Sequence, residues 1–191
     1  GVWRRKLERE AAESGRVSSV VRYEPGSAFS AHRHPLGEEI FVLSGVFGDE
    51  HGRYPAGTYL RNPPGSRHAP VCPEGCELLV KLDQFDPADR EPVCIQTGDT
   101  EWQPGLVAGL SVMPLHSFGV DHTALVRWAP GTEFHPHTHP GGEEIFVLEG
   151  TFEDEEGIYP QGAWLRNPAY SRHRPFSREG CTIYVKTGCI R

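Results

Sequence analysis

Short apolar segments recur along the chain, and each of them is closed by glycine, proline or acidic turn residues. In the first half they occupy residues 16–23, 39–47 and 76–82, with one more at the start of residues 57–68. Segments of this length between turn residues are typical of β-strands, and no part of the chain has a convincing helical periodicity. The pattern predicts an all-β protein built as an antiparallel sandwich or barrel.

The second half of the chain repeats the first. Residues 21–81 align with residues 126–186 at a constant offset of 105 without a gap, and 36 of the 61 positions are identical. Self-similarity of this degree means that one structural unit occurs twice. We therefore expect two lobes of similar fold that share an interface, each close to the lower size limit for independent stability.

The repeat also decides the segments outside the aligned region. Residues 1–15 favour a helix by propensity, yet the matching segment of the second copy favours a strand and turn, so we predict an edge strand. Arg4, Arg5 and Lys6 would discourage its pairing with other molecules. We predict a first domain at residues 1–85, a second at 105–191, and between them an acidic, proline-rich linker at 86–104 with one short strand at 93–96.

Composition narrows the range of partners. The net charge is −7 and no basic run is interleaved with aromatic residues, which argues against nucleic acid or an anionic membrane as a partner. Five cysteines at irregular spacing favour a reducing compartment over a disulfide framework, and no apolar run has membrane length. We expect a cytoplasmic protein with a small-molecule ligand, and we also consider a homodimer.

Each copy carries a set of residues with the spacing of metal ligands. Two histidines stand two residues apart, a glutamate follows four residues later, and a third histidine lies downstream. Alternate side chains of a strand point to the same face, so the paired histidines should converge. Three imidazoles and one carboxylate suit Zn, Fe, Mn or Ni better than Mg or Ca. The predicted ligands of two divalent metals per chain are His32, His34, Glu38 and His68, and His137, His139, Glu143 and His173.

The motifs around these residues resemble those of the cupins. A glycine, His-x-His, a glutamate and a second glycine at cupin spacing occur in both copies, beginning at Gly26 and Gly131. The first copy also fits the second cupin motif, whereas Ala169 and Tyr170 interrupt it in the second copy. The resemblance implies a bicupin, with two double-stranded β-helix jelly rolls as a tandem repeat.

More narrowly, the segments GEEIFVLEG and DEEGIYPQG resemble the cupin-like domain of the anti-sigma factor ChrR. Small cupins that resemble this chain include diketone dioxygenases, so one hypothesis is a metal-dependent dioxygenase acting on a small ketone, diketone or aromatic compound. The alternative is a non-catalytic ChrR-like module that senses a metal or ligand. Nothing before residue 16 supplies the histidine and cysteine pair of a zinc domain, so we expect no sigma-factor partner.

A few other residues invite weaker predictions. Glu39 and Glu144 should face away from the metal ligands by strand alternation, as hydrogen-bonding or surface carboxylates. Tyr59 and Arg61 share a strand face that could bind an anionic or planar ligand or pack against the other lobe, as do Trp164 and Arg166. Cys76 and Cys181 are expected to be core thiols. Tyr170 and His135 favour the second lobe as the catalytic one, because they could supply an aromatic lid and a proton carrier.

Overall fold

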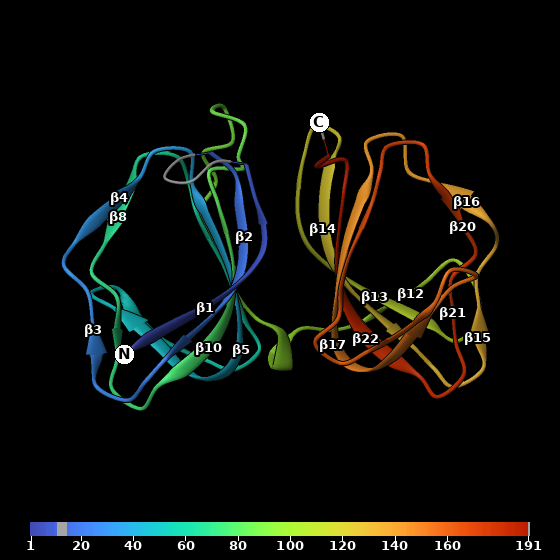
Figure 1. The fold of residues 1–191 in the computed structure, drawn as a ribbon, viewed down its shortest axis with the longest axis horizontal. Coiled ribbons are helices and arrows are strands. Elements are labelled where there is room, and N and C mark those ends of the chain that lie inside the picture. The colour runs from blue at the N-terminus through green and yellow to red at the C-terminus, as the bar shows by residue number, and fades with distance from the viewer. Residues whose placement is uncertain (11–14, 191) are drawn as a thin grey trace. The chain divides into compact units, whose positions relative to one another are not determined.

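The computed structural model describes residues 1–10 and 15–190, and its regular structure consists almost entirely of β-strands (Figure 1). Within these residues the helical structure is one 3-10 turn, η1 (Thr97–Asp99). Contacts within the chain divide it into two compact units, Gly1–Thr100 and Glu101–Arg191. Each unit is a curled antiparallel β-structure, so the all-β, two-barrel prediction is confirmed.

The first unit is built on a nine-stranded antiparallel sheet with the central order β1-β2-β10-β5-β7-β11. The bounds of these strands are β1 (Val2–Arg9), β2 (Val17–Tyr23), β10 (Cys76–Leu82), β5 (Glu38–Asp49), β7 (Thr58–Asn62) and β11 (Val93–Gln96). Shorter strands branch from this path: β3 (Ser27–Ala28), β6 (Gly52–Pro55) and β9 (Val71–Cys72). A separate ribbon pairs β4 (His32–His34) with β8 (Ser66–His68).

The second unit repeats this arrangement with the order β12-β13-β14-β22-β17-β21-β15. Its path consists of β12 (Gln103–Pro104), β13 (Leu110–Phe118), β14 (Asp121–Trp128), β22 (Cys181–Thr187), β17 (Glu143–Glu153), β21 (Phe176–Ser177) and β15 (Thr132–Glu133). Strands β18 (Ile158–Pro160) and β19 (Trp164–Asn167) pair with β17. The separate ribbon pairs β16 (His137–Thr138) with β20 (Arg172–His173).

The long strand β5 closes the first barrel because it bends in the middle. Its first half pairs with β10 and β7, and its second half pairs with β6 and β9. The bend falls at Gly45, whose φ is 71°, and a Cβ there would lie 2.2 Å from the carbonyl oxygen of Gly75. In the second unit, a Cβ at Gly150 of β17 would likewise lie 2.2 Å from the carbonyl oxygen of Gly180. A side chain is excluded at both positions, which explains why each copy has glycine there.

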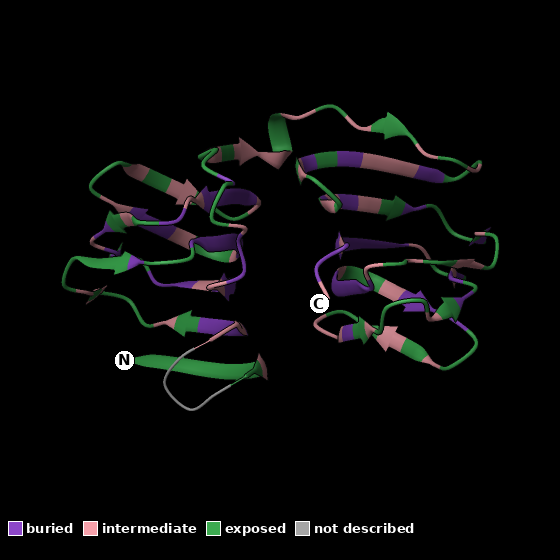
Figure 2. Ribbon diagram, turned by 90° about the horizontal axis from the view of Figure 1, so that it is seen from above, coloured by how far each residue is buried: buried purple, intermediate pink, exposed green. Residues whose placement is uncertain are grey.

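Apolar side chains of the curled sheets fill the interior of each unit. In the first unit the core contains Val21, Ile40, Val42, Leu78 and Val80, with Phe47 almost fully buried among them. Figure 2 shows the buried segments on the central strands and the exposed segments on loops and on β1. Burial of each large apolar side chain contributes about 1.5–3 kcal/mol, so this shared core is the main source of each unit's stability.

The strand predicted at the N-terminus is present. β1 pairs antiparallel with β2 and forms the edge of its sheet, although residues 11–14 of the segment lie outside the described residues. The short strand predicted at 93–96 is also present, because β11 pairs with β7. That pairing places this part of the expected linker within the sheet of the first unit. No helix among the described residues has the length and hydrophobicity that a bilayer-spanning segment requires.

Candidate metal centres

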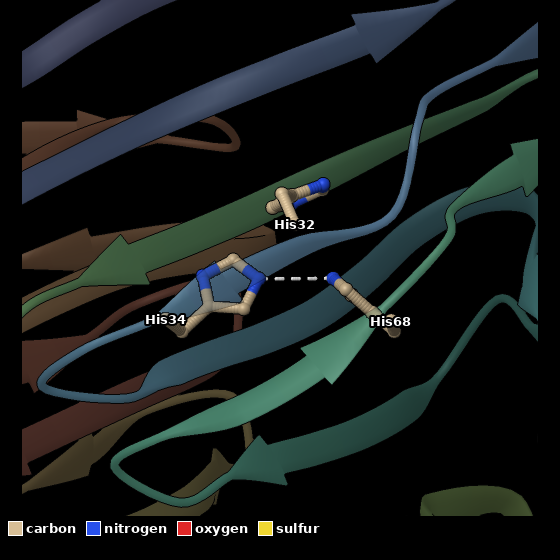
Figure 3. Close-up of side chains that lie close together, drawn as sticks. All are labelled: His32, His34 and His68. Atoms are coloured by element: carbon tan, nitrogen blue, oxygen red, sulfur yellow. Dashed lines mark hydrogen bonds between the residues drawn. The ribbon is translucent and has the colours of Figure 1, made fainter.

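Three imidazoles converge in the first unit on the ribbon of β4 and β8. The register of this ribbon places His32 opposite His68, while His34 follows two residues later on the same face. The ring nitrogens of the three histidines that could bind a metal lie within 4.8 Å of one another. Figure 3 shows the rings around one point, with Nε2 of His34 lying 3.0 Å from Nε2 of His68. The face shared by His32 and His34 is the one that strand alternation predicts.

A carboxylate completes the first cluster. Glu38 is the first residue of β5, and its Oε2 lies 3.5 Å from Nε2 of His34 and 3.3 Å from Nε2 of His68. Asn62 on the neighbouring strand β7 donates a hydrogen bond of 3.0 Å to the same oxygen. The side chain of Glu38 is therefore held toward the two imidazoles by a neighbour that cannot itself neutralise its charge.

The hydrogen bonds of the outer ring nitrogens orient the histidines. Nδ1 of His32 lies 3.0 Å from the carbonyl oxygen of Ser30, which can only accept a proton, so Nδ1 carries the hydrogen. Nδ1 of His68 faces Oδ2 of Asp49 at 3.2 Å. In both histidines the Nε2 lone pair is then available at the centre of the cluster, as ligation of a metal requires.

The second unit builds a matching cluster. His137 lies opposite His173 in the ribbon of β16 and β20, and its Nε2 is 2.9 Å from Nε2 of His139 and 3.2 Å from Nε2 of His173. The oxygens of Glu143 lie 3.3 Å from His139 and 3.5 Å from His173. Nδ1 of His137 donates to the carbonyl of His135, 2.9 Å away, as Nδ1 of His32 does to that of Ser30.

Burial acts on the protonation of both clusters. Burial, with a smaller effect of the neighbouring imidazoles, lowers the pKa of His34 and of His139 to about 4. Burial also raises the pKa of Glu38 and of Glu143 to about 7, against the opposing hydrogen bond from an asparagine. Without a bound cation these groups favour their neutral forms, so each cluster is a desolvated set of donors for positive charge.

The separations between donor atoms fit a transition metal. Ligands at about 2.1 Å from a metal lie about 3.0 Å apart at right angles and about 3.4 Å apart in a tetrahedron. The separations among His34, Glu38 and His68 run from 3.0 to 3.5 Å, and those quoted for the second cluster run from 2.9 to 3.5 Å. The donor set of imidazole nitrogens and one carboxylate suits Zn, Fe, Mn or Ni. Separations of this size join His34, Glu38 and His68 in the first unit and the four predicted residues of the second, while His32 lies within 4.8 Å of its two partner histidines.

Other candidates from the sequence have different environments. Glu39 is turned away from the cluster as expected, but it is buried rather than at the surface, and it accepts a 2.6 Å hydrogen bond from Tyr59. Arg61 is buried as well, paired with Glu39 and Asp89, and its guanidinium stacks on a phenylalanine. Tyr59 and Arg61 therefore form a closed structural network, and the ligand-binding role considered for them has no accessible face.

The side chains that favoured the second lobe for catalysis are also placed. Tyr170 is 74% exposed, and its backbone N–H donates a hydrogen bond of 3.0 Å to the carbonyl oxygen of His139. The ring of His135 packs against Phe134, with centroids 5.5 Å apart, and the residue's carbonyl is what orients His137. Cys76 and Cys181 are buried free thiols, as predicted.

Sequence reasoning missed the residues that orient the ligands. Asp49 and Asn62 contact His68 and Glu38, and their counterparts Asp154 and Asn167 lie beside His173 and Glu143. All four belong to positions that are identical in the two copies. That identity was the available signal, but it is shared with many core and turn positions and could not single them out.

Comparisons with known proteins agree on the fold. No curated protein sequence matches the chain. A solved structure of a dioxygenase candidate from Nostoc punctiforme has a TM-score of 0.83 at 18% identity, covering 97% of this chain and 73% of the other. Oxalate decarboxylase from Lactobacillus farciminis gives 0.73 at 15% identity, with coverage of 100% and 82%. Salicylate 1,2-dioxygenase from Pseudoaminobacter salicylatoxidans gives 0.71 at 13% identity, with coverage of 91% and 68%.

A family model matches almost the whole chain. The model describes the ChrR cupin-like domain, and it matches residues 1–86 and again residues 90–191. The two matches correspond to the two copies of the repeat, each with its own cluster of three histidines and a glutamate. Together the repeat, the paired barrels and these matches show that the chain belongs to the ChrR cupin-like domain family, with two such domains in tandem.

Proposed function

We propose that each lobe binds one divalent transition metal through its three imidazoles and one carboxylate. The first site uses His32, His34, Glu38 and His68, and the second uses the four residues at the same offset of 105. The observation that carries this proposal is the convergence of Nε2 atoms at 2.9 to 3.2 Å in both clusters. His68 and His137 have a hydrogen-bond acceptor at Nδ1, so their Nε2 lone pairs are directed into the clusters and are available to a cation.

We further propose that the chain is an enzyme of dioxygenase type that acts on a small aromatic or ketone compound. Four protein ligands leave one or two exchangeable positions on an octahedral metal, and a bound metal would act there as a Lewis acid toward a chelating substrate. The protein's own contribution is positioning: Asp49 and Asn62 hold two of the ligands, and apolar walls exclude water. The likeness to a salicylate dioxygenase and to a dioxygenase candidate supports this class.

A non-catalytic module that senses a metal or a ligand is the second candidate, because the family match is to the ChrR cupin-like domain. Measurement of oxygen uptake distinguishes the dioxygenase from the sensing module. Protein purified without added metal is first analysed for its metal content and then screened against aromatic and diketone substrates. Uptake that disappears in His34→Ala or His139→Ala, while each variant keeps its fold, supports the enzyme. Full metal loading without turnover of any substrate in the panel supports the sensing module.

A further inference from the structure

The first metal cluster borders a cavity of about 580 Å³ inside the first lobe. Three residues of the cluster, His32, His34 and Glu38, line this cavity. Apolar side chains from the three strands β2, β5 and β10 also line it: Val21, Ile40, Phe47, Leu78 and Val80. The volume and the mixed wall suit a small molecule with an apolar body.

The outer wall of this cavity is cationic. Arg4, Lys6 and Arg9 of β1 line it, together with Arg33 of β4. Their orientation follows from strand pairing, because their partners on β2 also line the cavity: Val21 opposite Arg4, Ser19 opposite Lys6 and Val17 opposite Arg9. A bulge between Lys6 and Glu8 shifts the alternation by one residue and so keeps Arg9 on the same face as Lys6.

Two cations of this wall, Arg4 and Lys6, are available to a ligand. Arg4 and Lys6 are exposed, and neither forms an ion pair with any residue in the described part of the chain. The two carboxylates that line the cavity are already engaged: Glu38 faces the histidines, and Asp83 accepts a hydrogen bond from the backbone of Leu36. Four cations around one cavity, in a protein of net charge −7, indicate a preference for anions.

The second lobe lacks these cations although its fold is the same. Strand pairing identifies the equivalent positions, since Val126, Ala124 and His122 of β14 correspond to Val21, Ser19 and Val17 of β2. The residues paired with them are Val112, Pro114 and Ser117, and Thr138 occupies the position of Arg33. The fold therefore does not require basic residues on this strand. In the first lobe they can protect the exposed edge of β1, and those that line the cavity can also recognise a ligand.

We propose that the first-lobe cavity binds a small organic anion, whose charged group pairs with Arg4, Lys6 and Arg33 while its apolar body packs on the barrel wall. Its opposite end reaches the metal cluster, and this part of the inference rests on the proposed metal function. A neutral diketone would leave the cationic wall unused. The first lobe is thus selective for anions and the second lobe is not.

The test compares two probes that differ only in charge. Calorimetry measures the dissociation constants of 3,4-dihydroxybenzoate and of its neutral amide, 3,4-dihydroxybenzamide, for the full chain. The catechol end of both can chelate a metal, and only the first carries an anion. We expect the carboxylate to bind at least tenfold more tightly. Arg4→Ser with Lys6→Ser should remove most of that preference, because the double variant lacks two of the positive charges that line the cavity. Arg5→Ser is the matched control, because Arg5 lies on the opposite face of the same strand.

The same titrations on metal-free protein separate this inference from the proposed function. Removal of the metal by a chelator should lower the affinity of the protein for both probes, while the preference for the carboxylate remains. A protein that holds no metal yet keeps the preference would overturn the metal proposal alone. Equal affinity for the two probes in both states, binding of neither probe to metal-loaded protein, or an equal loss from Arg5→Ser would overturn the anion site. β1 is an exposed edge strand, so these substitutions should leave the fold intact. Circular dichroism and the melting temperature of each variant protein check this.

Discussion

Oδ2 of Asp49 lies 3.2 Å from Nδ1 of His68, whose Nε2 on the other side of the ring faces His34 and Glu38. The other oxygen of Asp49 accepts a hydrogen bond of 3.1 Å from the hydroxyl of Tyr54, so the carboxylate is itself held in place. A carboxylate at this position fixes the histidine tautomer and makes Nε2 a better donor to a metal. In the second lobe Asp154 lies 4.0 Å from His173, whose buried Nδ1 has no hydrogen-bond partner in the described chain.

The difference between the two aspartates leads to the first prediction. Asp49→Asn should weaken metal binding at the first site by about 10- to 100-fold, the usual effect of losing a carboxylate that supports a ligand. Asp154→Asn should have a smaller effect, because its contact with His173 is longer. Competition with a chromophoric chelator measures both affinities. Equal losses from the two variants would contradict the role given to the shorter contact.

The second prediction concerns pH and the metal-free protein. Burial raises the pKa of Glu38 from 4.5 to about 7, so its contribution to stability is complete below pH 4.5 and is lost as the pH rises through 7. His34 has the opposite dependence: its pKa is lowered from 6.5 to about 4, so its contribution is complete above pH 6.5 and is lost as the pH falls toward 4. Both the wild type and Glu38→Gln contain His34, so the pH dependence that His34 contributes cancels in the difference between their free energies of unfolding.

Glu38→Gln should therefore gain stability relative to the wild type as the pH rises from 4.5 to 8. The gain should reach roughly 3 kcal/mol, from 1.36 kcal/mol for each unit of pKa shift. Urea unfolding of the chelator-treated proteins at several pH values gives the two free energies of unfolding. If their difference does not change with pH, Glu38 is not the buried, protonated group that its surroundings indicate.

The third prediction concerns the bend of β5. Gly45→Ala places a Cβ 2.2 Å from the carbonyl oxygen of Gly75 and also strains a backbone with a φ of 71°, so it should destabilise the fold by several kcal/mol. Gly26→Ala is the control, because that glycine has a φ of 80° but no atom near its Cβ position. It should cost about 1 kcal/mol. Denaturant midpoints of the two variants should differ accordingly, and similar midpoints would show that backbone strain alone limits both sites.

Metal removal supplies the fourth prediction. Imidazoles and carboxylates gathered inside a barrel lose stabilisation without a cation, and a ligand at 100 times its dissociation constant adds about 2.7 kcal/mol of stability. For a protein of this size we expect chelation to lower the melting temperature by about 5–10 °C for each site. Calorimetry before and after verified metal removal measures this change. An unchanged melting temperature would mean that the barrels hold the ligands in position without the metal's help.

Much of the fold and the composition of both clusters could be predicted from the sequence, because the repeat doubled every signal. The spacing of His32 and His34 predicts a shared strand face, and the residues between His34 and Glu38 predict a turn. Both predictions depend only on local backbone geometry. The long-range pairing of β4 with β8, which brings His68 to His32, could be expected only from the cupin resemblance. The burial of Glu39 beside Arg61 could not be predicted, because Asp89, the second carboxylate that pairs with Arg61, lies in a segment expected to be a linker.

The cationic wall of the first cavity was the feature least accessible to sequence reasoning. The sequence predicts that Arg4 and Lys6 protect an edge strand, and β1 is such an edge. Which face each residue takes depends on the register with β2 and on the bulge after Lys6, and neither can be derived from alternation alone. The comparison with Val112 and Pro114 likewise needed the pairing of β13 with β14.

The measurement that tests the central claim most directly is the metal content of each chain, determined by elemental analysis after reconstitution and removal of loosely bound ions. The account predicts two equivalents for the wild type, one for His34→Ala, one for His139→Ala and none for the double variant, with all four proteins folded. A wild-type value clearly below one equivalent, or an unchanged value in the double variant, would contradict the assignment of the two histidine clusters as metal centres.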